Sequence, residues 1–266
     1  MSQGTIHVDL REDKGAKVAW VTIDHQARLN SLNGALMDQF VRDLDSLSED
    51  TELRAIVLSG AGEKAFVGGA DIDEMAGFDS GRARQFITRV HRCCAAVRNC
   101  PVPVIARING HVLGAGLELA ASCDLRVSSD SARFGMPEVR LGIPSVVEAA
   151  VLPTLIGWGR TRQLLLLGET YGAQQALQWG LVEEVTSNET LDTVIGGWLD
   201  SLIACGPNSI RLQKQLMRRW EDLPLRDAIR TGIDTFAQAY ETDEPAQMMQ
   251  AFRAAHRARK AAGHQG

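Results

Sequence analysis

Short apolar runs alternate with helical patterns along this 266-residue chain, and that alternation restricts the folds it can adopt. Three runs, 54–59 (RAIVLS), 104–108 (VIARI) and 124–128 (DLRVS), have the length and composition of buried strands. Apolar residues recur at helical spacing over 33–47, before the first run, and over 81–98, between the first two. Buried strands joined by helices favour an α/β fold in which the strands pair in parallel.

Both ends of the chain add to this pattern. Two strands are predicted at 5–10 and 17–24, and the turn Glu12-Asp13-Lys14-Gly15 predicts that they form a hairpin. From Ser145 the predicted elements are helices over 145–155, 160–168 and 173–179, a strand over 181–185, and helices over 189–204, 207–219, 223–240 and 244–262. We therefore predict a core over residues 1–200 and a helical region over 201–266 that docks on the core or on another subunit.

Charge and cysteine usage exclude several classes of protein. The net charge of −5 gives no global basic field for nucleic acid. The five cysteines include no metal-type CxxC pair, which predicts reduced thiols. No apolar stretch reaches the roughly 18 residues that span a bilayer, and the first residues lack a signal-peptide pattern. The expectation is a cytoplasmic protein that acts without a membrane or nucleic acid.

Two glycine-rich segments predict backbone binding sites. The first, 64–75 (KAFVGGADIDEM), follows a strand, and its small residues let ligand atoms approach the N–H groups. The second, Gly114-Ala115-Gly116, opens a predicted helix, whose first N–H groups lack internal partners. Two such N–H groups aimed at one oxygen form an oxyanion hole. A dinucleotide site is disfavoured because Leu119 stands where GxGxxG has its third glycine.

Two acids accompany the second segment. Glu118 lies among Leu117, Leu119 and alanines, and Glu138 follows a proline twenty residues later. Apolar surroundings and a nearby like charge both raise a carboxyl pKa. The pair is therefore predicted to hold one proton between them, as an acid and a base.

The segments AFVGGADIDEM and NGHVLGAGLELAASCDLRVSSDSARFGMPEVRLGIP, in this order and spacing, resemble the enoyl-CoA hydratase/isomerase (crotonase) superfamily. The early ARLNSLN and the late GLVEEV match it as well, so that the resemblance covers residues 5–260. It implies a core of spiralling ββα turns, a C-terminal helical trimerisation region, and trimers that pair into hexamers. It also implies an acyl-CoA thioester substrate, of which coenzyme A is a part, with no separate cofactor and no metal.

The resemblance also implies roles for individual residues. It places the two oxyanion N–H groups on Ala70 and Ala115. It makes Glu118 and Glu138 the glutamates that hold the attacking water, take its proton and protonate Cα. Further substrate contacts are expected at Gly68, Asp71, Ile72 and Gly114, although Asp71 is also well placed to cap a helix.

The chain departs from the family pattern at two places. Many members have a lysine after the residue that matches Ile72, and this chain has Asp73, which leaves Arg28 or Lys64 to bind the CoA phosphates. The segment IPSVVEAAVLPTLIG replaces the commoner IPGxGGTQRL and puts Glu148 where glycine is usual. Glu148 either reaches the pocket as a third acid or forms an ion pair, and the substrate difference is expected in this segment because it should border the acyl pocket.

These observations predict a hydro-lyase, an enoyl-CoA hydratase that converts 2-trans-enoyl-CoA to 3-hydroxyacyl-CoA in fatty-acid or related catabolism. An enoyl-CoA isomerase needs only one base and is the nearest alternative. A specialised hydrolase or lyase of the same superfamily is another. A protein of a different class, binding RNA or acting as a scaffold, has support only from arginines on the helix over 81–98 and a basic tail.

Overall fold

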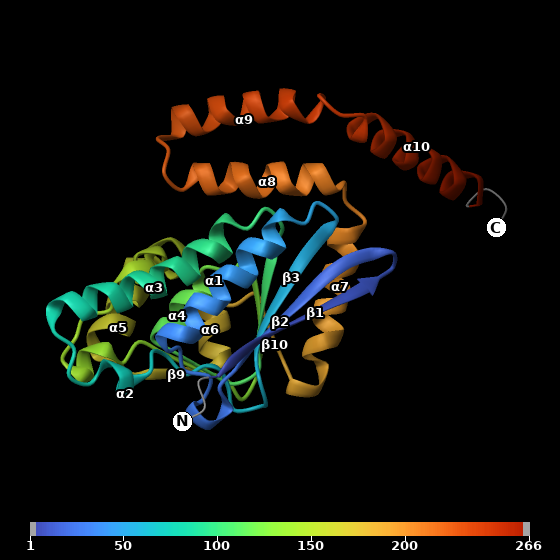
Figure 1. Cartoon of the computed structure of the whole chain (residues 1–266). Helices are drawn as coiled ribbons and strands as arrows, with labels where there is room; N and C mark the ends of the chain where they lie inside the picture. Colours follow the sequence, from blue (N-terminus) through green and yellow to red (C-terminus); the bar gives the residue numbers. More distant parts are fainter. Residues whose placement is uncertain (1–3, 263–266) are drawn as a thin grey trace. The chain divides into compact units, whose positions relative to one another are not determined.

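The computed structural model describes residues 4–262, which divide into two compact units between Asp200 and Ser201 (Figure 1). All strands of the described residues lie in the first unit. No helix within 4–262 is long and apolar enough to cross a membrane.

A six-stranded sheet forms the larger layer of the first unit. In sheet order its strands are β1 (Thr5–Asp13), β2 (Ala16–Asp24), β3 (Leu53–Gly60), β5 (Val104–Ile108), β7 (Leu125–Ser129) and β10 (Glu184–Thr186). β1 and β2 form the predicted antiparallel hairpin, with residues 14–15 at its turn, and every later pairing is parallel. The alternation of buried strands and helices therefore predicted both the α/β class and the parallel pairing.

A second sheet consists of four strands of three residues each. They are β4 (Ala65–Val67), β6 (His111–Leu113), β8 (Arg133–Gly135) and β9 (Thr170–Gly172), with β4, β6 and β8 parallel and β9 antiparallel to β8. Along the chain, β3 precedes β4, β5 precedes β6, and β7 precedes β8, so each turn of the chain adds one strand to each sheet. This arrangement confirms the predicted spiral of ββα turns.

Helices complete each turn of the first unit. The α-helices are α1 (Gly34–Glu49), α2 (Ile72–Met75), α3 (Ser80–Asn99), α4 (Ala115–Ala121), α5 (Leu152–Leu167), α6 (Ala173–Trp179) and α7 (Leu191–Ile203). The 3-10 turns are η1 (Gln26–Arg28), η2 (Glu138–Leu141), η3 (Val147–Val151) and η4 (Asn188–Thr190). α7 continues across the boundary between the two units. Side chains cap the first turns of α1 and α3: Asn33 accepts a hydrogen bond from the Leu36 N–H, and Asp79 accepts one from the Arg82 N–H. α1 and α3 pack side by side on one face of the large sheet (Figure 1).

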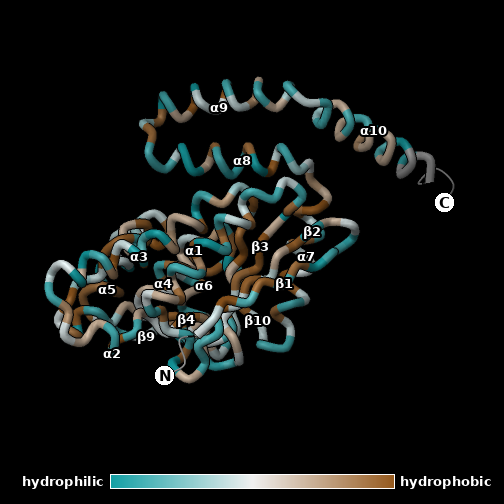
Figure 2. Tube along the Cα trace, viewed as in Figure 1, coloured by the Kyte–Doolittle hydropathy of each residue, from teal (hydrophilic) through white to brown (hydrophobic). Residues whose placement is uncertain are grey.

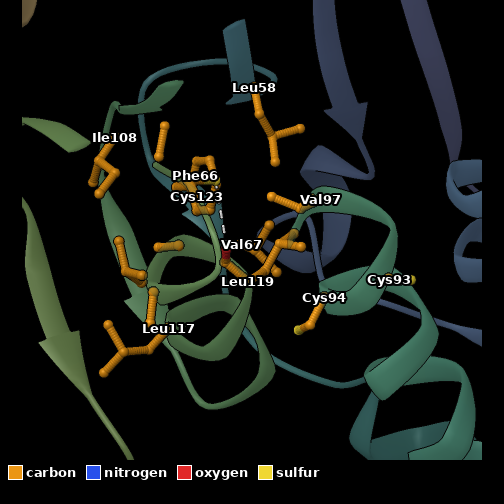
Figure 3. Packing of buried hydrophobic residues seen from close by; sticks show 14 of the residues in the cluster. Leu58, Phe66, Val67, Cys93, Cys94, Val97, Ile108, Leu117, Leu119 and Cys123 are labelled. Carbon is orange, nitrogen blue, oxygen red and sulfur yellow. Dashed lines mark hydrogen bonds between the residues drawn. The ribbon is translucent and has the colours of Figure 1, made fainter. Parts of the chain in front are cut away.

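The core between the sheets and helices fixes the position of α4. β3 is buried along most of its length and is largely hydrophobic (Figure 2). Leu117 and Leu119 of α4 pack among residues of β4 and α3, such as Phe66 and Val97 (Figure 3). At Gly116, a Cβ atom would lie 2.1 Å from the Val67 carbonyl oxygen, so only glycine lets α4 approach β4 this closely.

The second unit consists of helices. They are α8 (Pro207–Trp220), α9 (Leu225–Ala239) and α10 (Glu244–Ala262). The Glu244 carboxylate accepts hydrogen bonds from the N–H groups of Asn208 (2.9 Å) and Ser209 (2.8 Å), and so caps α8. The Trp220 indole donates to the Ala228 carbonyl at 3.0 Å and ties α8 to α9. One face of α9 is an exposed apolar stripe, formed by Leu225, Ile229, Ile233 and Phe236.

The segment after Ile143 differs from its prediction. A helix was expected over 145–155, but η3 begins at Val147 and the α-helix begins only at Leu152. Val147 has φ +41°, a left-handed conformation that β-branched residues rarely adopt and that interrupts any helix through this point. Gly157, with φ 73° and ψ 158°, puts a kink within α5, where the prediction separated two helices.

Candidate active site

Three parallel strands of the small sheet end at one cavity. β4, β6 and β8 are neighbours in the sheet, so the loops at their carboxyl ends lie along the same edge. These loops line a cavity with a volume of about 100 Å³, to which they contribute Gly68 to Ala70, Gly114 with Ala115, and Pro137 with Glu138. Glu118 on α4 lines the same cavity. The two glycine-rich segments and the two acids, far apart in sequence, therefore converge.

The backbone around Ala70 and Ala115 leaves N–H groups for a ligand. Leu32 forms a bridge to the chain at Ala70, in which its N–H donates to the Gly69 carbonyl (2.8 Å) and its carbonyl accepts from the Asp71 N–H (2.9 Å). The N–H of Ala70 itself takes no part in this bridge. Ala115 is the first residue of α4, a position whose N–H has no partner within the helix. Both alanines line the cavity, and their role as an oxyanion hole stays a prediction.

Gly114 allows the second acid to approach the start of α4. Its backbone has φ 51° and ψ −122°, a conformation favoured by glycine, and its N–H donates to the Gly135 carbonyl at 2.9 Å. A Cβ atom at this position would lie 2.5 Å from Oε1 of Glu138. The glycine therefore provides the space in which the Glu138 carboxylate lies.

The Glu118 carboxyl group is held in its neutral form. The residue is only 3% exposed. Burial, followed by the negative charge of Glu138, raises the pKa of Glu118 to about 8. The backbone of Ala149 opposes this rise in pKa, and the charge of Glu148 adds to it. At neutral pH Glu118 therefore carries a proton that it can donate.

The Glu138 carboxylate has a hydrogen-bond donor that the sequence analysis did not identify. The Ser145 hydroxyl donates to Oε2 of Glu138 at 2.8 Å, and both residues line the cavity. Ser145 occupies a position where the family pattern has glycine, and this replacement was the only sequence signal of its role. The two glutamates therefore have different environments: Glu138 accepts a side-chain hydrogen bond, and burial raises the pKa of Glu118.

Other predicted binding residues lie outside the cavity lining. Ile72 lines the cavity, but Arg28, Lys64 and Asp71 do not. Arg28 pairs with Asp73, and Asp71 accepts hydrogen bonds from the N–H groups of Asp73 and Glu74. Asp71 therefore caps α2, as its alternative interpretation expected, and CoA binding by Arg28 or Lys64 stays a prediction.

Glu148 forms an ion pair and does not line the cavity. Its Oε1 lies 2.8 Å from Nδ1 of His91 on α3. Of the two alternatives predicted for Glu148, the ion pair is confirmed.

The remaining cavity wall is apolar. Phe86, Ile87 and Val90 project from α3, residues that the sequence pattern placed in the core. Pro144 and Val146 come from the segment that departs from the family pattern. The described residues contain no group of three or more His, Cys, Asp or Glu side chains that could hold a metal ion.

Comparisons with known proteins find similar sequences and a similar fold. A family model described as enoyl-CoA hydratase/isomerase matches residues 13–259. The chain is 34% identical to a short-chain-enoyl-CoA hydratase of Clostridium acetobutylicum, over 90% of this chain and 92% of that protein. It is 33% identical to a 2,3-dehydroadipyl-CoA hydratase of Escherichia coli, over 89% and 92% of the two chains. The crystal structure of an enoyl-CoA hydratase from Bacillus anthracis superposes with a TM-score of 0.88 at 31% identity, covering 94% of this chain and 96% of that one.

Proposed function

The chain belongs to the enoyl-CoA hydratase/isomerase family, and we propose on this basis that it adds water across the 2,3 double bond of an enoyl-CoA. The product is a 3-hydroxyacyl-CoA, and the reaction belongs to the catabolism of acyl-CoA thioesters such as fatty-acid β-oxidation. The observation that carries the proposal is the pair of glutamates on one cavity, one held neutral and the other hydrogen-bonded as a carboxylate.

The thioester carbonyl is proposed to bind between the N–H groups of Ala70 and Ala115. Negative charge develops on the carbonyl oxygen when a nucleophile attacks Cβ, and fixed N–H groups stabilise that charge. The position of Ala115 at the start of α4 adds the positive end of the helix dipole. These groups make Cβ electrophilic without a metal or a separate cofactor.

The two glutamates then move the protons. Glu138 takes a proton from water, whose oxygen forms the bond to Cβ. Glu118 gives its proton to Cα, so that the double bond gains one H and one OH in total. Since Oε2 of Glu138 is engaged by Ser145, Oε1 above Gly114 is the oxygen proposed to accept the proton of the water.

The cavity wall favours a neutral hydrocarbon acyl group. Apart from Glu118 and Glu138, its lining side chains are uncharged. A dehydroadipyl chain ends in a free carboxylate, which would lose its hydration here without gaining a cation and would face two acids. We therefore propose a substrate closer to that of the short-chain relative than to the dehydroadipyl substrate.

The protein is proposed to act as a homotrimer, or as a hexamer of two trimers, in the cytoplasm. The apolar stripe of α9 supports the assembly, because single-chain proteins rarely expose contiguous apolar surface of this kind. All five cysteines are free thiols, which is typical of a reducing compartment.

The test is the loss of the enoyl-thioester ultraviolet absorbance in the presence of wild type, Glu118→Gln and Glu138→Gln. Each variant is expected to lose at least about 100-fold in kcat, because each removes a proton-transfer group. Near wild-type rates in both variants would refute the mechanism. In parallel, the protein is incubated with a 3-enoyl-CoA. Formation of the 2-enoyl-CoA without its hydration would identify the protein as an isomerase.

A further inference from the structure

The Glu148 carboxylate is buried next to the site at a cost in stability. The residue is 7% exposed, and Oε2 is buried without a hydrogen-bond partner among the described residues. A buried carboxylate oxygen without a partner is destabilising, and the glycine usual at this position would avoid the cost. The role of this charge in the molecule therefore needs an explanation.

Glu148 comes from the same turn that holds Glu118. The backbone of Val146 and Ala149, on either side of it, faces the Glu118 carboxyl group and lowers its pKa. Between them Val147 takes its left-handed conformation. η3 packs against both α3 and α4, so Glu148 lies between the helix that carries His91 and the helix that carries Glu118.

The charged and titratable groups around Glu118 come from three elements. Glu138 of η2 and Glu148 of η3 both raise the pKa of Glu118 by charge repulsion. The Cys94 thiol of α3 faces the same group, and burial, Glu148 and Glu118 raise its pKa so that it stays neutral. His91 of α3 pairs with Glu148, and its side chain is 54% exposed.

We propose that Glu148, tied to His91, is a positioning residue that keeps Glu118 in its acid form. The proposal rests on the proposed function, in which Glu118 is the proton donor. The negative charge of Glu148, carried on the η3 turn that packs against α4, disfavours loss of the Glu118 proton.

The test measures the titration midpoint of Glu118 directly, by carbon NMR of the intact protein labelled at its glutamate carboxyl carbons. The signal is assigned by its absence in Glu118→Gln. Glu148→Gln keeps the shape of the side chain and removes its charge, so the Glu118 midpoint is expected to fall by about one pH unit. The basic limb of kcat/KM for hydration is expected to move down equally, and Glu148→Gly is expected to act in the same direction.

Two controls separate charge from structure. His91→Asn keeps a donor near the Nδ1 position and leaves Glu148 charged, so the midpoint is expected to stay near that of wild type. Asp38→Asn removes a carboxylate that pairs with Arg89 on the same helix, and no shift is expected. An unchanged midpoint in a folded Glu148→Gln variant overturns the proposal, as does an equal shift in His91→Asn. A shift as expected, in a protein that hydrates no enoyl-CoA, supports the proposed coupling and refutes only the function.

Discussion

Glu118 and Glu138 have the same side chain, and their surroundings give them different tasks. Glu118 lies on a helix packed into the core, where water cannot stabilise its charge. Glu138 lies in a 3-10 turn at the cavity wall, is only partly buried, and receives a hydrogen bond from Ser145. In the proposed mechanism, the buried Glu118 is the acid and Glu138 is the base.

The raised pKa of Glu118 predicts how stability depends on pH. The pKa of Glu118 in the folded protein, about 8, lies above the ordinary 4.5. The stability that protonated Glu118 contributes to the folded state is therefore fully present below pH 4.5 and is lost as the pH rises to 8. The Glu118→Gln variant has no titrating group at this position, so its free energy of unfolding lacks this decrease. Between pH 4.5 and 8 the free energy of unfolding of the variant, minus that of wild type, is expected to increase by on the order of a few kcal/mol. Urea unfolding of both proteins at several pH values measures this difference, and parallel curves would contradict it.

The hydrogen bond from Ser145 to Glu138 predicts how substitutions of Ser145 affect the rate. Ser145→Ala and Ser145→Gly remove the donor to Glu138 and are expected to lower kcat about tenfold, since a hydrogen bond to a charged group contributes roughly 1.5–3 kcal/mol. Ser145→Thr keeps the hydroxyl and should restore most of the rate. Equal losses in all three variants would assign Ser145 a packing role only.

The elements of the fold differ in how well the sequence predicts them. The helices over 80–99 and 207–220 lie within one residue of their predictions, because a long apolar stripe at helical spacing is a strong signal. The strands β4, β6 and β8 went unrecognised individually, because three residues are too few to show alternation. The second sheet was expected only through the family resemblance.

The residues of the site, like the strands, were predictable from the sequence only in part. Glycine-rich segments predicted backbone positions such as Ala115 and acids such as Glu118, and these converge on the cavity. Ser145 and His91 carried no pattern of their own, because their roles depend on contacts with Glu138 and Glu148 that only the folded chain forms. The left-handed conformation of Val147 also could not be predicted, because a valine does not mark such a position.

The contact between α4 and β4 predicts the effect of a single methyl group. Gly116→Ala places Cβ against the Val67 carbonyl, a backbone atom held in its sheet, and is expected to cost about 3 kcal/mol or to prevent folding. Gly142→Ala is the matched control: its φ is +77° but no atom lies within 4 Å of the added Cβ, so only about 1 kcal/mol is expected. Urea unfolding compares the two, and similar losses would show that the close approach is not limiting.

At the scale of the whole molecule, the apolar stripe of α9 predicts association between copies. Ile233 and Phe236 are 66% and 68% exposed in the single chain. Ile233→Glu puts a charge in the stripe and is expected to reduce the sedimenting mass to that of one chain, with helix content unchanged. Gln238→Glu adds the same charge to the opposite face of α9 and should leave the mass as in wild type. A wild-type protein that sediments as a single chain would refute the trimer.

The distribution of the site over successive loops also affects how such a protein changes through evolution. The loops after β4 and β6 carry the groups for the carbonyl, while the loop after β8 carries the base and leads into the acyl wall. Each loop is attached to its own strand, so a lineage can alter one and inherit the others intact. The replacements at Ser145 and Glu148 are changes of this kind, confined to one loop. New reactions and substrates can therefore arise on this scaffold without rebuilding the part that activates the thioester.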